Sequence, residues 1–321
     1  MISVLIPTYK RLPFLKRAIE DVFAQTFKDW ELIITDDEVG PGESWGWLKS
    51  LAKKDARIKI IKNLGPKHGQ VFNVNNGLRH CRGEWIKVLF DDDRMLPNCL
   101  ERMLRVAERV PSAAMIGCRA QKWRNGVYAG DEKNFAKGTA DIIASNDCRE
   151  AILLFDRWNG RTPTHMLINR SSVTEKSLMP EHVSYKIPVD WVWFAAILDS
   201  GDYVMMSDTL VCQCEGEVCS ITGDARKNEC TLDREMFLAY KDIYDGLSDE
   251  KKNRLSFEAI NSELNGIRGI YHLKCRHVYI GLKKIMKSFK SFRGMMFTLR
   301  WVMQELLPSR FSVTKRRTIN V

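Results

Sequence analysis

The first 110 residues alternate between short apolar runs and longer stretches with helical spacing. The apolar runs predict strands at residues 3–6, 30–35, 58–62 and 84–90. Apolar residues that recur every three or four positions predict helices at residues 11–25, 47–53, 70–81 and 97–110. Strands separated by helices favour an α/β fold, with a mostly parallel twisted sheet flanked by helices.

The pattern changes along the rest of the chain. Residues 111–225 are less regular, with predicted strands at 114–118 and 166–168 and a predicted helix at 189–198. Residues 226–321 have mainly helical spacing. We therefore predict three parts, with boundaries near residues 110 and 225, of which the last is a helical extension.

Charge separates this extension from the body. The net charge is +10, but residues 264–321 hold thirteen Lys and Arg and only one acid, Glu305, which leaves about −2 for residues 1–263. Basic and bulky apolar residues alternate at helical spacing from 270 to 307, which predicts association with an anionic membrane surface. The alternative is a helical extension that packs on the body and keeps a solvated basic face. Nucleic acid is not an expected partner, because no recognition module is present.

Several signals are missing from the sequence. The nine cysteines are scattered without a second CxxC pair, which favours reduced thiols over zinc sites or disulfides. No signal peptide and no apolar run of about 18 residues is seen. We therefore expect a cytoplasmic protein, peripheral at the inner face of the membrane if the basic helices bind it. No GxGxxG or GxxxxGK[ST] follows the first strand, which argues against a dinucleotide fold or a P-loop.

Polar clusters follow the predicted strands, where ligands of parallel sheets bind. They are Pro7-Thr8-Tyr9, Asp36-Asp37 and Asp91-Asp92-Asp93. Three adjacent aspartates raise one another's pKa unless a cation neutralises them, and Mg²⁺ or Mn²⁺ shared with a diphosphate would do so. A solvated acidic turn or a helix cap is the alternative for the triplet alone.

Five sequence blocks give the triplet a context. They are VLIPTYKR (4–11), QTFKDWELIITDD (25–37), NNGL (75–78), GE (83–84) and FDDD (90–93). In order and spacing they resemble the family 2 glycosyltransferases, which have the GT-A fold. The resemblance implies a nucleotide-sugar-binding half in residues 1–110, an acceptor-binding half in residues 111–225 and the helical extension in 226–321.

The resemblance implies contacts to the nucleotide. Pro7, Thr8 and Tyr9 would line the base pocket, and Asp37 would accept a hydrogen bond from the base, most simply uracil N3–H. Asn75 would lie under the nucleotide. The alternatives are an aromatic residue at a strand end for Tyr9 and a surface amide for Asn75.

The resemblance also implies a metal site. Asp91 would meet the ribose or diphosphate, and Asp93, together with Asp92, would hold Mn²⁺ or Mg²⁺. The segment 38–44 departs from the family, whose members follow the aspartate pair with a small residue, Ser and another Asp.

A base for the acceptor hydroxyl is predicted in the second half. The segment IPVDWVWF (187–194) resembles the family's catalytic site, and Asp190 takes the position of the base. The alternative is a helix-capping role, and Glu181 is a weaker competitor. His165 and Glu215 are weaker candidates for contacts to the donor or acceptor sugar, and Cys214 or Glu215 stands where the family often has a histidine.

The resulting prediction is an inverting glycosyltransferase. It would move a sugar from a nucleotide-sugar donor, expected to be a UDP-sugar, to a hydroxyl of a lipid-linked or cell-surface glycan precursor. Another nucleotide-sugar enzyme, such as a nucleotidyltransferase, and a non-catalytic nucleotide-binding protein are the alternatives.

Overall fold

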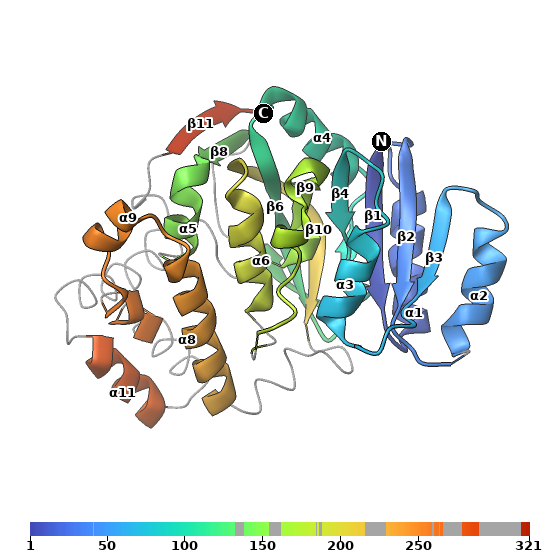
Figure 1. Cartoon of the computed structure of the whole chain (residues 1–321). Coiled ribbons are helices and arrows are strands. Elements are labelled where there is room, and N and C mark those ends of the chain that lie inside the picture. The colour runs from blue at the N-terminus through green and yellow to red at the C-terminus, as the bar shows by residue number, and fades with distance from the viewer. Residues whose placement is uncertain are drawn as a thin grey trace.

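The computed structural model describes most of the chain (Figure 1). The described residues are 1–40, 42–131, 138–153, 162–183, 185, 188–215, 229–258, 260–262, 264–265, 278–288 and 316–321. Much of the basic segment 270–307 therefore lies outside the described residues, apart from one helix.

The first 110 residues form the alternating half that the sequence predicts. Its elements are β1 (Ile2–Thr8), α1 (Leu12–Phe23), β2 (Trp30–Asp36), α2 (Glu43–Ala52), β3 (Ile58–Lys62), α3 (Gln70–Leu78), β4 (Trp85–Val88), β5 (Arg94–Met95) and α4 (Cys99–Arg109). Strands β4, β1, β2 and β3 are neighbours in this order and all pairs are parallel. Their carboxyl ends consequently meet at one edge of the sheet.

The middle of the chain continues the same sheet. Its elements are β6 (Ala113–Arg124), β7 (Val127–Asp131), β8 (Thr139–Ile143), α5 (Ser145–Leu153), β9 (Met166–Asn169), α6 (Val189–Leu198) and β10 (Asp202–Glu215), with 3₁₀ turns η1 (Pro163–His165), η2 (Arg170–Ser172) and η3 (Glu175–Ser177). Strand β10 is parallel to β6, whereas β9 is antiparallel to both β4 and β6.

This region is more regular than its sequence predicts. Strands β6 and β10 are the two longest described strands, yet the sequence pattern predicted only part of the first. Their pairing contains register shifts between Met205 and Val211, and such shifts break the alternation of apolar and polar residues that marks a strand.

The last part of the chain is not purely helical. Its described elements are α8 (Glu229–Asp245), α9 (Asp249–Arg254), α11 (Val278–Ser288) and β11 (Arg316–Asn320). Strand β11 pairs antiparallel with β8 and closes one edge of the sheet, and Thr318 donates a 2.7 Å hydrogen bond to Asp141. The basic sequence of β11 suits an edge strand, where charge discourages further pairing. None of the described helices is both long and apolar enough to cross a bilayer.

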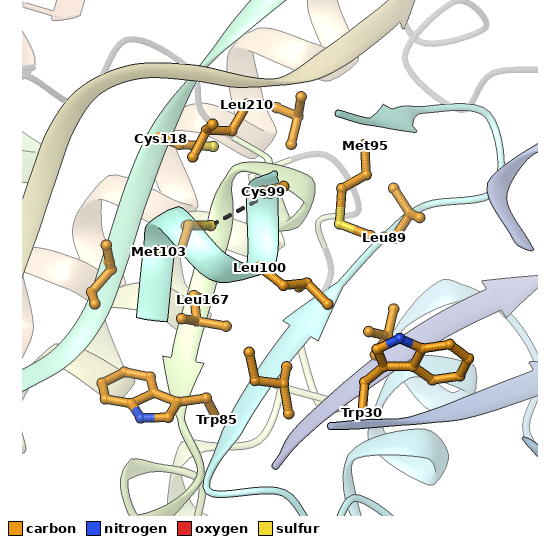
Figure 2. Packing of buried hydrophobic residues seen from close by; sticks show 14 of the residues in the cluster. Trp30, Trp85, Leu89, Met95, Cys99, Leu100, Met103, Cys118, Leu167 and Leu210 are labelled. Carbon is orange, nitrogen blue, oxygen red and sulfur yellow. Dashed lines mark hydrogen bonds between the residues drawn. The ribbon is translucent and has the colours of Figure 1, made fainter. Parts of the chain in front are cut away.

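Helices cover both faces of the sheet. One cluster of buried apolar residues joins α1, α2 and α4 to the sheet, and part of it is shown in Figure 2. A second cluster joins α3, α5, α6 and α8 to the opposite face and extends to Leu264. Neighbouring residues of β1 divide between them, since Val4 belongs to the first cluster and Leu5 to the second, as the twofold repeat of a strand requires.

Two glycines of the sequence blocks allow close packing on β1. A Cβ atom on Gly77 would lie 2.2 Å from Cδ1 of Leu5, and one on Gly83 would lie 2.4 Å from the backbone nitrogen of Ser3. These glycines therefore bring helix α3 and the start of β4 against the first strand, which fixes the edge where the polar clusters gather.

Candidate active site

The acidic triplet begins three residues after β4 ends and is tied to the loop that follows β1. Thr8 donates a 2.7 Å hydrogen bond from its hydroxyl to Asp91. The Arg11 guanidinium lies 3.2 Å from a carboxylate oxygen of Asp91 and 2.9 Å from one of Asp92. The first two carboxylates thus share one cation supplied by the chain itself.

Burial controls the charge of Asp91. Its residue is only 5% exposed, and burial, followed by repulsion from Asp92, raises the pKa of Asp91 to about 6. The hydrogen bond from Thr8 and the charge of Arg11 oppose this rise. The site therefore holds a carboxylate that is costly to ionise without a positive partner.

Asp93 is as buried as Asp91 and has different partners. One of its oxygens accepts a 3.0 Å hydrogen bond from the backbone N–H of Cys214 at the end of β10. The hydroxyl of Thr164 lies beside the same carboxylate. Burial, with repulsion from Asp92, raises the pKa of Asp93. Sequence reasoning selected His165 from the segment before β9 and not Thr164, because nothing in the sequence distinguishes this hydroxyl from its neighbours.

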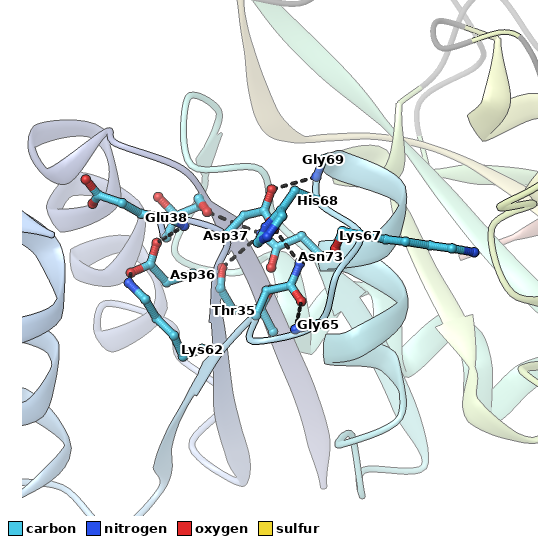
Figure 3. Close-up of polar contacts among 12 residues, drawn as sticks. Thr35, Asp36, Asp37, Glu38, Lys62, Gly65, Lys67, His68, Gly69 and Asn73 are labelled. Atoms are coloured by element: carbon cyan, nitrogen blue, oxygen red, sulfur yellow. Dashed lines mark hydrogen bonds and ion pairs between the residues drawn. The ribbon is translucent and has the colours of Figure 1, made fainter. Parts of the chain in front are cut away.

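Asp37 is enclosed by the loop between β3 and α3 (Figure 3). Its carboxylate accepts hydrogen bonds from the Asn63 amide at 2.5 Å and from the backbone N–H of Gly69 at 2.6 Å, and Nδ1 of His68 lies 3.1 Å away. Asn63 and His68 were also missed by sequence reasoning. The only available signal was that their polar loop connects a strand to the helix carrying Asn75.

The neighbouring carboxylate, Asp36, belongs to an ion pair. Lys62 lies 2.7 Å from Asp36, and both side chains are buried. The backbone N–H of Glu38 donates a 3.0 Å hydrogen bond to the other oxygen of Asp36. This pair holds the ends of β2 and β3 together beside Asp37.

The remaining residues predicted near the nucleotide have different surroundings. Pro7 and Thr8 end β1 and are buried, whereas Tyr9 is 52% exposed with the ammonium of Lys10 5.3 Å from its ring centre. Asn75 is fully buried rather than on the helix surface, and its amide donates to the Met179 carbonyl at 2.9 Å and accepts from the Met179 N–H at 2.9 Å. The alternative of a surface amide is therefore wrong, while contact between Asn75 and a nucleotide stays a prediction.

Asp190 stands in the first turn of α6. This helix leads into β10 through residues 199–201, and Asp202 begins β10 beside the start of β6. Helix α6 therefore runs opposite to β10 and begins toward the end of the sheet where Cys214 contacts Asp93 (Figure 1). Within the described structure, Oδ1 of Asp190 is buried without a hydrogen-bond partner, and burial raises the pKa of Asp190 to about 7.

The two weaker candidates for sugar contacts, His165 and Glu215, lie in different places. His165 is fully buried, and its Nδ1 lies 3.1 Å from the Thr162 hydroxyl in a capping interaction with η1. Glu215 ends β10 opposite Arg124 of β6, and its side chain lies outside the described residues. Neither arrangement tests a sugar contact, so both stay predictions.

The residues of the triplet suit a hard divalent cation. Asp93 and Asp92 offer carboxylate oxygens, and Mg²⁺ or Mn²⁺ typically needs one or two of these together with phosphate oxygens. No group of three or more His, Cys, Asp or Glu side chains with metal-binding geometry occurs in the described part of the chain. A cation here would depend on a ligand to complete its coordination.

Comparison with known proteins identifies the class. The model of the family described as glycosyl transferase family 2 matches residues 3–174, which is more than half of the chain, so the chain belongs to this family and is a glycosyltransferase. The fold is the GT-A fold. S. aureus TarS 1–349, solved with UDP-GlcNAc, has a TM-score of 0.63 at 17% identity over 82% of this chain and 71% of that one. The mannosyltransferase PcManGT from Pyrobaculum calidifontis, solved with GDP-Man and Mn²⁺, has a TM-score of 0.54 at 13% identity over 96% and 88%.

Two curated relatives match part of the chain. The GalNAc(5)-diNAcBac-PP-undecaprenol beta-1,3-glucosyltransferase of Campylobacter jejuni is 34% identical over 124 residues, which are 39% of this chain and 40% of that protein. The UDP-Glc:alpha-D-GlcNAc-diphosphoundecaprenol beta-1,3-glucosyltransferase WfgD of Escherichia coli is 30% identical over 104 residues, or 32% and 40%. The chain thus matches less than half the length of either relative.

Proposed function

We propose that the chain is an inverting glycosyltransferase that moves a sugar from a UDP-sugar to a hydroxyl of a lipid-linked glycan precursor. The names of the Campylobacter and Escherichia relatives support the acceptor class, since each is a glucosyltransferase named for a diphosphoundecaprenol-linked acceptor, and the Escherichia name also gives UDP-Glc as the donor. The complex of TarS with UDP-GlcNAc supports a UDP-sugar as donor.

The observation that carries the inverting mechanism is the Asp190 carboxylate, whose Oδ1 is buried. A general base works best when its pKa is close to the working pH, and burial brings the pKa of Asp190 to about 7. Its Oδ1 has no hydrogen-bond partner in the described structure, which leaves it able to accept the proton of an acceptor hydroxyl.

The donor would bind along the carboxyl ends of β1, β2 and β4. Asp37 would accept the N3–H of uracil, with Pro7 and Tyr9 beside the base and Asn75 beneath the nucleotide. Oδ1 of Asp37 already contacts Asn63 and His68, whereas Oδ2, among the described residues, accepts only from Gly69 and keeps a further acceptor site for the base.

The acidic triplet would hold the diphosphate end of the donor. Asp93 and Asp92 would bind Mn²⁺ or Mg²⁺, which when bound supplies positive charge to the departing UDP. Thr8 and Arg11 keep Asp91 and Asp92 oriented. In one displacement Asp190 takes the acceptor proton, the acceptor oxygen bonds to the anomeric carbon, and the bond from that carbon to the diphosphate oxygen breaks, so the anomeric configuration inverts.

Product stereochemistry tests this proposal. The enzyme is incubated with Mn²⁺, a panel of UDP-sugars and a diphosphate-linked N-acetylhexosamine acceptor, and the new linkage is examined by proton NMR. We expect UDP release and a β-linked product from an α-linked donor. A retained configuration contradicts the role of Asp190 as base, and the absence of both transfer and UDP-sugar hydrolysis across the panel contradicts the assignment of a UDP-sugar donor.

We further propose that helix α11 places the enzyme on an anionic membrane surface. Lys283, Met286 and Lys287 of this helix are exposed, a combination that suits lipid headgroups. Deleting the tail is an unsuitable test, because it removes β11 from the sheet. Replacing Lys283 and Lys287 with Gln should instead reduce cosedimentation with phosphatidylglycerol vesicles, and unchanged binding contradicts the role of α11.

A further inference from the structure

A fully buried lysine lies on the strand that leads to the acidic triplet. Lys87 is 0% exposed in the middle of β4. Its neighbours Ile86 and Val88 face the cluster containing α3 and α6, so Lys87 points to the opposite face, toward α4. Met103 and Cys99 of α4 belong to the apolar cluster on that face (Figure 2).

The contacts of this lysine are made with neutral groups. Its ammonium donates to the backbone carbonyl of Thr164, and the sulfur of Met103 lies 3.9 Å away. No carboxylate forms an ion pair with Lys87 in the described part of the chain. Burying an ammonium among apolar side chains costs several kcal/mol by general estimates, so its retention at this position requires a reason.

Thr164 connects Lys87 to the site. The residue is fully buried. Its carbonyl accepts from Lys87, and its hydroxyl accepts a 3.2 Å hydrogen bond from the backbone N–H of Phe90, whose own carbonyl accepts a 3.1 Å hydrogen bond from the backbone N–H of Asp93. Thr164 therefore links the lysine to the backbone turn that places Asp93, and its hydroxyl lies beside the Asp93 carboxylate.

We propose that Lys87 is a positioning residue for Asp93. By holding the carbonyl of Thr164, it fixes the Thr164 hydroxyl against the backbone N–H of Phe90 and beside Asp93, and so keeps this carboxylate oriented toward an incoming divalent cation. The inference rests on the proposed function, in which Asp93 is a cation ligand. Residues that orient a metal ligand through a hydrogen bond typically change metal affinity by about 10- to 100-fold when they are replaced.

If Lys87 had only a structural role, its replacement would have a different effect. Methionine has a similar length without the charge, and an uncharged side chain often suits a buried site as well or better. Lys87→Met would then leave Mn²⁺ affinity unchanged and alter only the stability of the fold. Metal affinity therefore separates the two roles.

The experiment measures Mn²⁺ binding without catalysis. Free Mn²⁺ is followed by electron paramagnetic resonance in the presence of UDP, for the full chain and for variants that unfold cooperatively. We expect Lys87→Met and Thr164→Val each to weaken Mn²⁺ binding about tenfold or more. Thr164→Ser retains the hydroxyl and should restore affinity, and Met103→Leu, which changes only the other neighbour of the lysine, should stay within about twofold of the unaltered chain.

The double variant tests whether the two residues act together. If Lys87 works through the Thr164 hydroxyl, combining Lys87→Met with Thr164→Val should weaken binding little more than either change alone. Additive losses, or unaltered affinity in Lys87→Met, overturn the positioning role while leaving the cation site in place. An unaltered chain that binds no Mn²⁺ with UDP contradicts the proposed function and removes the inference with it.

Discussion

One carboxylate in the mixed half of the sheet differs from the buried carboxylates in the parallel half. In the parallel half, Asp36 is paired with Lys62, Asp37 is contacted by three groups of one loop, and Asp91 is bound by Thr8 and Arg11. In the mixed half, one oxygen of Asp190 is buried with no hydrogen-bond partner in the described structure.

This difference distinguishes carboxylates suited to binding a nucleotide from a carboxylate suited to accepting a proton. A carboxylate that is held by several donors keeps its shape and charge when a ligand arrives, which suits recognition of a nucleotide. A carboxylate that is buried without donors binds a proton more tightly, which suits proton abstraction near neutral pH. The same residue type therefore serves two purposes because its surroundings differ.

The largest expected effect follows from removing the unpartnered carboxylate. Asp190→Asn keeps the shape of the side chain but cannot accept the proton, so kcat should fall about 10²- to 10⁴-fold while donor affinity is unchanged. Single-turnover transfer and UDP binding by calorimetry measure the two quantities. Glu181→Gln is the matched control, because Glu181 is a carboxylate just before the same helix and already accepts a hydrogen bond from Asn75. A loss in the control and not in Asp190→Asn would reverse the assignment.

The next largest effect is expected from breaking the buried ion pair between Lys62 and Asp36. Lys62→Met leaves Asp36 buried beside no cation, which should destabilise the fold by about 3 kcal/mol. Urea unfolding measures this difference. Lys59→Met on the same strand is the control, since Lys59 contacts His80 rather than a carboxylate, and it should cost clearly less. Equal costs would mean that Asp36 does not depend on its partner.

The pH dependence of the transfer rate should reflect the raised pKa of Asp190. The pKa of Asp190 is raised to about 7, so the base form becomes abundant only as pH rises through this value. At saturating donor and Mn²⁺, kcat should increase about tenfold from pH 6 to pH 8 and then level off. The residual rate of Asp190→Asn should lack this rise, and a similar rise in that variant would assign the titration to another group.

Sequence reasoning was most successful where local pattern determines structure. Strand β3 and helix α6 have the predicted bounds, because each is an apolar segment enclosed by turn-forming residues. Most of the parallel half was predicted for the same reason, and the family resemblance was confirmed. Strand β11 could not be predicted, because its basic sequence becomes a strand only through pairing with β8.

The partners of the site residues were harder to predict than the residues themselves. Thr164 and Cys214 reach Asp93 from segments 71 and 121 positions away along the chain, and the contact from Cys214 uses a backbone N–H that any residue type could supply. Such contacts depend on the register of β10 against β5 and β6, which periodicity does not specify. The environment that raises the pKa of Asp190 is likewise a property of the folded chain.

The last expected effect is on the stability of the fold, and it links the fold to the mechanism. Because the pKa of Asp190 is higher in the folded chain than its ordinary value of 3.8, the unfolded chain loses this proton first, and the stability contributed by the protonated group declines as pH rises from about 4 to about 7. Asp190→Asn removes this penalty, so its melting temperature should exceed that of the unaltered chain by more at pH 8 than at pH 5. Glu108→Gln, at an exposed position on α4, should show no such difference. If Asp190→Asn melts at the same temperature as the unaltered chain at both pH values, burial of the Asp190 carboxylate has no cost, and this carboxylate has a partner in solution. Asp190 would then not differ from Asp36, Asp37 and Asp91.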